Sequence, residues 1–139
     1  MRRIACLTII AACLAAAAPA AAAPRISVAP DPVDRDQTQI VKGRGWPVIE
    51  FCKRRVRIRL LSDQNAVLLG FAPVRDNGHF RFEWSPDDAN VGAGSRFEWS
   101  PDDANVGAGS WRLVARMRCE SGDDGSPVFM RRSKSIRIR

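Results

Sequence analysis

The amino-acid sequence predicts an all-β fold, a two-sheet sandwich of about seven short antiparallel strands, and two observations carry that prediction. Apolar and polar residues alternate with a period of two in several short segments, which is typical of strands that bury one face. Glycine, proline, aspartate and asparagine separate these segments at short intervals. No segment after the first two dozen residues sustains a helical period, so we expect two sheets joined by Greek-key links.

Seven segments are expected to be strands. In chain order they cover 26–28, 40–43, 53–61, 66–74, 80–84, 111–119 and 128–139. Pro30 and Pro32 end the first strand, because proline cannot donate a hydrogen bond to a ladder. The tripeptide Asp76-Asn77-Gly78 is expected to turn the fourth strand into the fifth, since asparagine and glycine tolerate positive φ.

The first 22 residues are expected to be a secretory signal peptide. Arg2 and Arg3 precede an apolar run over 4–18, too short for a membrane span, and small residues follow at an A-x-A cleavage site. Cleavage after Ala22 leaves 23–139, the size of one domain, exported to the periplasm or the extracellular space. An alternative stays open, in which Ile10-Ala11-Ala12-Cys13 is a lipobox and Cys13 carries a lipid anchor. No later stretch is long and apolar enough for a transmembrane segment.

A fifteen-residue segment is duplicated. Residues 81–95 recur without change at 96–110. Repeat architectures use longer units and at least three of them, so we interpret 96–110 as a loop insertion. The first copy continues the alternation from Phe80 and is expected to form the strand. The second copy is expected to lengthen the following loop, with Phe97 and Trp99 poorly buried or paired as an edge strand.

Two cysteines remain after the signal peptide, and an oxidising compartment predicts a disulfide between Cys52 and Cys119. If they lie opposite each other in the third and sixth strands, one face holds the apolar pairs Val56–Ala115, Ile58–Leu113 and Leu60–Trp111. The other face holds the pairs Arg55–Arg116, Arg57–Val114 and Arg59–Arg112. A slip of one residue would bury the arginines, so the disulfide and the hydrophobic pattern support the same alignment.

Arginine is the main functional signal in the sequence. The chain has 22 basic and 15 acidic residues, and because the expected leader holds only Arg2 and Arg3 of these, residues 23–139 carry a net charge of +5. The third, sixth and seventh strands are expected to share a sheet with an arginine-rich outer face. Its members are Arg55, Arg57, Arg59, Arg112, Arg116, Arg118, Arg137 and Arg139.

Guanidinium groups in this number suggest a face that binds polyanions, namely anionic polysaccharides, lipid headgroups or nucleic acid. No exposed aromatic residue is apparent on that face, which disfavours nucleic acid. Two alternatives stay open: a generic basic surface, and a face buried against an acidic protein of the envelope.

The sequence assigns no catalytic residue, no metal ligand and no cofactor. His79 is the only histidine and lies at a turn, with no nucleophile indicated beside it. The aspartate pairs at 87–88, 102–103 and 123–124 do not have the spacing of a calcium loop and are interpreted as solvated turns. The one enzymatic alternative is a small secreted hydrolase of envelope polymers.

Several motifs resemble a known family. They are Ile26-Ser27-Val28-Ala29-Pro30, the segment 41–47 leading into 56–60, Asp76-Asn77-Gly78-His79-Phe80, and the segment 109–115. With these the chain resembles the bacterial immunoglobulin-like domains of exported, cell-envelope proteins over nearly all of 25–139. Related domains often carry cysteines where Cys52 and Cys119 lie, whereas Trp111 stands where tyrosine is commoner. The resemblance implies adhesion, spacing or binding without shared catalytic residues, so we expect a non-enzymatic binding or structural module.

Overall fold

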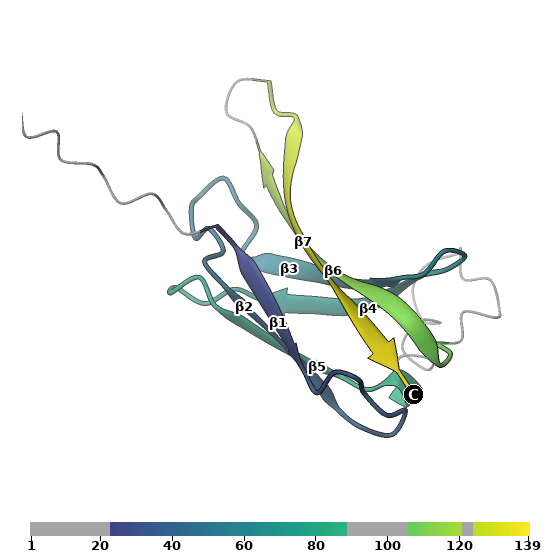
Figure 1. The fold of residues 1–139 in the computed structure, drawn as a ribbon. Coiled ribbons are helices and arrows are strands. Elements are labelled where there is room, and N and C mark those ends of the chain that lie inside the picture. The colour runs from purple at the N-terminus through teal and green to yellow at the C-terminus, as the bar shows by residue number, and fades with distance from the viewer. Residues whose placement is uncertain (1–22, 89–105, 121–123) are drawn as a thin grey trace, which may run out of the picture.

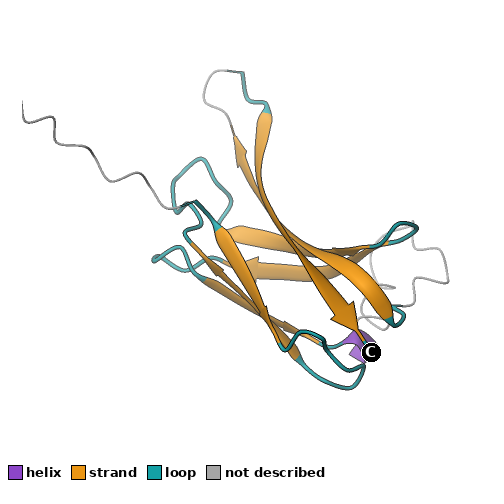
Figure 2. Ribbon diagram, in the orientation of Figure 1, coloured by secondary structure: helices purple, strands orange, loops and turns teal. Residues whose placement is uncertain are grey.

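A computed structural model describes residues 23–88, 106–120 and 124–139, and it consists of two antiparallel sheets (Figure 1). The strands are β1 (Arg25–Ala29), β2 (Gln39–Arg44), β3 (Arg55–Leu61), β4 (Ala66–Pro73), β5 (Phe80–Trp84), β6 (Gly109–Glu120) and β7 (Pro127–Ile138). One sheet has the order β1-β2-β5 and the other the order β4-β3-β6-β7. A helical turn at 86–88 follows β5, and the rest of the described chain is strand or loop (Figure 2). The prediction of an all-β, two-sheet fold is confirmed.

The observed strands match the seven predicted segments closely. β3 begins two residues later than expected and β6 two residues earlier, at Gly109. The expected turn after β4 is present: Gly78 has φ 75° and donates its N–H to the Arg75 carbonyl at 2.9 Å. A positive φ of this kind is open to glycine at no steric cost, which explains why the turn forms there. The β-hairpin that Asp76-Asn77-Gly78 indicates is not formed, because β4 pairs with β3 in one sheet and β5 pairs with β2 in the other.

The core lies between the two sheets and is lined by alternate residues of the strands, although β7 is buried only near its C-terminal end. Its most deeply buried apolar side chains include Val41, Val56, Ile58, Leu60, Leu113, Met117 and Ile138. Gln39 is also fully buried, and both ends of its amide are satisfied. Its Nε2 donates to the Pro30 carbonyl at 2.7 Å, and its Oε1 accepts from Trp84 Nε1 at 3.2 Å. A buried amide with both partners costs little, so it is compatible with a stable core.

The expected disulfide joins Cys52 to Cys119, but the alignment of β3 with β6 differs from the prediction. Cys52 lies opposite Cys119 in an isolated bridge, whereas within the strands Ile58 lies opposite Ala115 and Leu60 opposite Leu113. The predicted pairs of Val56, Ile58 and Leu60 are therefore wrong by two residues. On the outer face Arg57 lies opposite Arg116, Arg59 opposite Val114, and Leu61 opposite Arg112. The predicted partners of Arg55, Arg57 and Arg59 are wrong by the same shift.

The shift arises between the disulfide and the first strand pair. Lys53 donates its N–H to the Arg118 carbonyl at 2.9 Å, in the same register as the two cysteines. Arg55, in contrast, donates its N–H to the carbonyl of Lys53 in its own segment, at 2.7 Å. Between the cysteines and the pair Arg57–Arg116, the segment that leads into β3 contains two more residues than the facing part of β6. This irregularity is of the kind that a β-bulge introduces. Because side chains alternate with a period of two, this shift keeps every side chain on its face. The prediction of which residues point inward is therefore confirmed.

The duplicated segment is described in part. The first copy forms β5, as expected, whereas Phe97 and Trp99 lie outside the described residues. The last residues of the second copy belong to the fold: Val106 is fully buried, and the Gly107 carbonyl accepts a hydrogen bond from Trp111 Nε1 at 2.9 Å. The insertion thus also supplies the entry to β6, which the sequence did not predict.

The expected signal peptide, with Cys13, lies outside the described residues. Within 23–88, 106–120 and 124–139, no helix has the length and apolar character needed to cross a bilayer.

Candidate anion-binding face

The outer face of the β4-β3-β6-β7 sheet carries a row of arginines on three adjacent strands. Arg57 in β3 lies directly opposite Arg116 in β6, and Arg116 lies directly opposite Arg131 in β7. Phe71 in β4 extends the row on the other side of Arg57. Directly opposite residues of an antiparallel pair have Cα atoms about 4.5–5.5 Å apart. We call Arg57, Arg116 and Arg131 the arginine row.

A shallow concavity adjoins this row on the side nearer the disulfide. Its volume is about 240 Å³, and it is lined by Lys53, Arg55, Arg57, Phe71, Arg116, Arg118 and Phe129. β3 and the segment before it, β6 and the two outer strands β4 and β7 all contribute side chains. We call this set the Arg–Phe concavity. Five of its seven side chains are cationic and none is acidic, so it is a strongly positive site.

Two phenyl rings support guanidinium groups within the concavity. Arg55 Cζ lies 4.9 Å from the centroid of the Phe71 ring, and Arg116 Cζ lies 3.8 Å from that of Phe129. The rings are 47% and 41% exposed, respectively. The prediction that this face lacks exposed aromatic residues is wrong. Both rings come from the outer strands of the sheet, β4 and β7, whose pairing with β3 and β6 brings them beside the arginines.

Within 23–88, 106–120 and 124–139, no ion pair neutralises the concavity or the arginine row. The ion pairs among the described residues are Arg54–Asp76, Arg81–Glu83 and Arg139–Asp34, and none of them involves the concavity or the arginine row. Burial lowers the pKa of the Arg57 guanidinium, and the nearby charges of Arg59 and Arg116 lower it further. The Nε atoms of Arg57 and Arg59 are buried without a hydrogen-bond partner in the protein. Because these Nε atoms are buried, an anion on this face would have to bind the exposed ends of the guanidinium groups.

The eight arginines predicted for the face divide into two groups. Arg55, Arg57, Arg116 and Arg118 come together in the concavity, and Arg59 lies next to Arg57 along β3. The others are farther along β6 and β7: Arg112 lies opposite Ser135, Arg137 opposite Ser110, and Arg139 pairs with Asp34 at 3.2 Å. The structure thus brings four of the eight arginines together in the concavity, whereas Arg139 lies beyond the end of β7.

Four residues of this surface were missed by the sequence reading: Lys53, Phe71, Phe129 and Arg131. The last two could have been found by pairing β6 with β7 as a hairpin, which puts Phe129 opposite Arg118 and Arg131 opposite Arg116. Phe71 required knowledge that β4 joins the same sheet. To predict that Lys53 lines the concavity, one would have needed the geometry of the segment that the disulfide holds.

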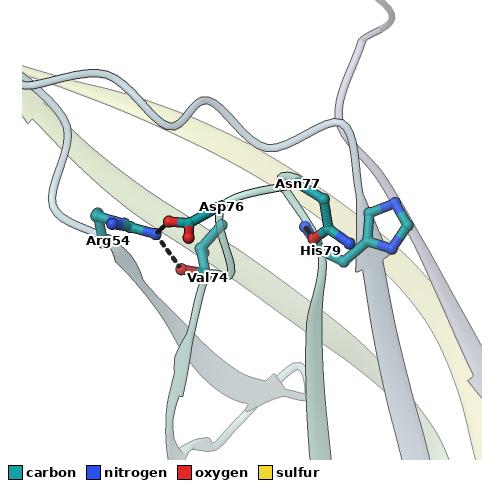
Figure 3. A network of polar contacts seen from close by, with 5 residues as sticks. All are labelled: Arg54, Val74, Asp76, Asn77 and His79. Carbon is teal, nitrogen blue, oxygen red and sulfur yellow. Dashed lines mark hydrogen bonds and ion pairs between the residues drawn. The ribbon is translucent and has the colours of Figure 1, made fainter.

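Arg54 lies close to the concavity in sequence but has a structural role (Figure 3). Its guanidinium pairs with Asp76 at the turn after β4, and Nη2 also approaches the Val74 carbonyl at 3.5 Å. In the same turn Asn77 Oδ1 accepts the His79 backbone N–H at 3.1 Å. The two contacts of Arg54 connect this turn to the segment before β3, and the charge of Arg54 is paired with that of Asp76.

A second basic concavity lies on the other sheet. Its volume is about 210 Å³, and it is lined by Lys42, Gly43, Arg44, Arg75, His79, Phe80 and Arg81. Arg81 is paired with Glu83, so this site is partly neutralised. The described residues contain no group of three histidine, cysteine or acidic side chains placed to hold a metal ion.

No protein-family model, curated protein sequence or solved structure matches the chain. Its function has to be inferred from the geometry and the charge of the outer face.

Proposed function

We propose that the protein is an exported, non-enzymatic immunoglobulin-like module of the cell envelope that binds anionic polymers through the Arg–Phe concavity and the arginine row. The observation that carries this proposal is the alignment of Arg57, Arg116 and Arg131 across three adjacent strands, with no ion pair to a carboxylate of the part of the chain that the structure describes. Like charges directly opposite each other destabilise a sheet. A bound anion would remove that cost.

The strand order supports an immunoglobulin-like assignment. In such domains the third, sixth and seventh strands form one sheet, as β3, β6 and β7 do here. The fourth strand of this chain extends that sheet, as the additional strands of variable-type domains do, instead of joining the other one. The Cys52–Cys119 disulfide supports export, because disulfides persist in oxidising compartments.

The chemistry of the face favours an anion that reaches several donors at once. Guanidinium groups bind carboxylates and phosphates through parallel N–H donors, and a row across three strands can contact successive charges of a polymer. Anionic polysaccharides and lipid headgroups fit this description, and an acidic envelope protein is the alternative partner. Phe71 and Phe129 remove the reason for disfavouring nucleic acid, so a single-stranded oligonucleotide belongs among the probes.

Retention on immobilised heparin as a function of salt tests the proposal. A variant with Arg55, Arg57, Arg116 and Arg118 changed to serine should elute at much lower salt than the wild type, because each lost contact reduces counterion release. A matched variant removes the same number of charges from the second concavity. It changes Lys42, Arg44, Arg75 and Arg81 to serine.

The matched variant should elute near the wild-type position. Equal losses in both variants would show that only the total charge matters, which is the behaviour of a generic basic surface. Unchanged retention of the first variant would reject the face as the binding site.

A further inference from the structure

We infer that the Arg–Phe concavity recognises a doubly charged phosphate group, a phosphomonoester, and therefore binds phosphorylated ligands in preference to carboxylate polymers. This inference rests on the proposed function and names the ligand class of the same site. The phosphate could belong to a phosphorylated polymer or to a lipid headgroup, because both present the same group.

The donors of the concavity are held in place before any ligand binds. Arg116 Cζ lies over the Phe129 ring and Arg55 Cζ over the Phe71 ring, and these cation–π contacts limit the movement of both guanidinium groups. A stacked guanidinium keeps its N–H groups in the plane and free at the edges, where they can donate to an oxyanion. Restricted donors lose less conformational entropy on binding than free surface arginines.

The density of positive charge favours a dianion. Arg57 and Arg116 lie directly opposite each other on adjacent strands, so one anion between them can accept from both. Lys53, Arg55 and Arg118 line the same concavity, which gives five cationic groups around one small space. A phosphomonoester carries a charge near −2 and three strong acceptor oxygens, whereas a carboxylate carries −1 and two oxygens. The phosphate therefore satisfies more of these donors in the same space.

The concavity is large enough for one phosphate group of a ligand but too small to enclose a whole drug-sized molecule. Its volume of about 240 Å³ lies below the range of roughly 300–1,000 Å³ typical of pockets that enclose a drug-sized molecule. The remainder of the ligand would lie across the sheet face, toward Arg131 at the end of the arginine row. Such an arrangement suits a phosphate borne by a larger scaffold.

The test compares two polymers with the same backbone. Dextran phosphate and carboxymethyl dextran, matched in chain length and charge density, compete with labelled heparin for the protein. We expect dextran phosphate to compete at a charge concentration at least about tenfold lower, which corresponds to one or two additional charge-assisted hydrogen bonds. A second arm measures binding to phosphatidylcholine vesicles that contain phosphatidic acid or phosphatidylglycerol at equal surface charge, since only phosphatidic acid carries a phosphomonoester.

A preference for the phosphomonoester in either arm supports the inference and identifies its source as polymer or lipid. A preference in neither arm overturns it. If the wild type binds both dextrans equally well and both kinds of vesicle equally well, the proposed function stands and only the phosphate preference fails. If it binds neither dextran nor heparin, the proposed function fails as well.

Variants of matched charge connect the preference to the site. Arg57→Ser with Arg116→Ser should abolish the preference, whereas Arg112→Ser with Arg137→Ser, on the same face but outside the concavity, should retain it. Arg57→Lys with Arg116→Lys keeps the charge but removes the planar donors, so heparin retention should persist while the preference falls. Loss of the preference in the Arg112 and Arg137 variant would overturn the assignment to the concavity.

Discussion

Gly43 offers a sharp test of how the core is packed. It lies in β2 directly opposite Phe80 in β5, and the phenyl ring covers it. A Cβ atom added to Gly43 would lie 2.7 Å from Phe80 Cζ and still closer to Cε1 and Cδ1. The ring is itself fixed: Phe80 is 3% exposed, and its centroid lies 5.6 Å from that of Trp46 in an edge-to-face contact. Gly43→Ala therefore requires the ring to leave its position.

The expected loss of unfolding free energy is about 3 kcal/mol. Deleting a buried phenyl ring costs about 3–5 kcal/mol, and forcing a side chain out of a well-packed core costs about 1–3 kcal/mol. The backbone of Gly43 is not among the glycines with positive φ, so the conformation itself accommodates alanine. In a Phe80→Ala background the obstacle is absent. Gly43→Ala should then be neutral or stabilise by up to about 1 kcal/mol, as alanine does relative to glycine within a strand.

Urea denaturation of the wild type, the two single variants and the double variant measures this coupling. The tryptophan fluorescence of Trp46 reports directly on the surroundings of Phe80, because the two rings are in contact. The reasoning requires a coupling free energy of about 3 kcal/mol between positions 43 and 80. Equal losses from Gly43→Ala in both backgrounds would refute it.

Two further predictions concern the disulfide and the duplication. Replacing Cys52 and Cys119 with alanine should lower the free energy of unfolding by about 4 kcal/mol, because the bond closes a loop with a sequence separation of 67 residues. A loss below about 1 kcal/mol in urea would contradict this. Deleting 96–110 should leave the fold unchanged or stabilise it by up to about 2 kcal/mol, because the connection from Asp88 to the buried valine shortens from 17 residues to two. The identical first copy then supplies the residues that now occupy 106–110, and unfolding of the deletion variant would show that the longer connection is required.

The duplication also shows where identical sequence acquires different roles. The first copy begins with four of the five residues of β5, and Phe80 before it completes the alternation of that strand. The second copy ends with Val106 in the core and with the first residues of β6. The local sequence is the same in both copies. The neighbouring residues therefore determine that the start of the first copy belongs to β5 and the end of the second copy to β6.

The sequence by itself determined the strands and their buried faces. A period of two in polarity is a local property, and burying one side of each strand leaves a single choice of face for segments such as β3 and β6. The same pattern put Arg55, Arg57 and Arg116 on the solvent side. The pairing of Cys52 with Cys119 followed from the cysteine count.

Only the tertiary structure decided which of those side chains meet. A shift of two residues between β3 and β6 leaves the polarity pattern unchanged, so the sequence could not distinguish Arg57 opposite Arg116 from Arg57 opposite Val114. The addition of β4 and β7 on either side brought Phe71 and Phe129 against the arginines. Contacts between strands depend on backbone irregularities and strand order, which arise from the whole fold, whereas the direction of each side chain depends only on its own strand.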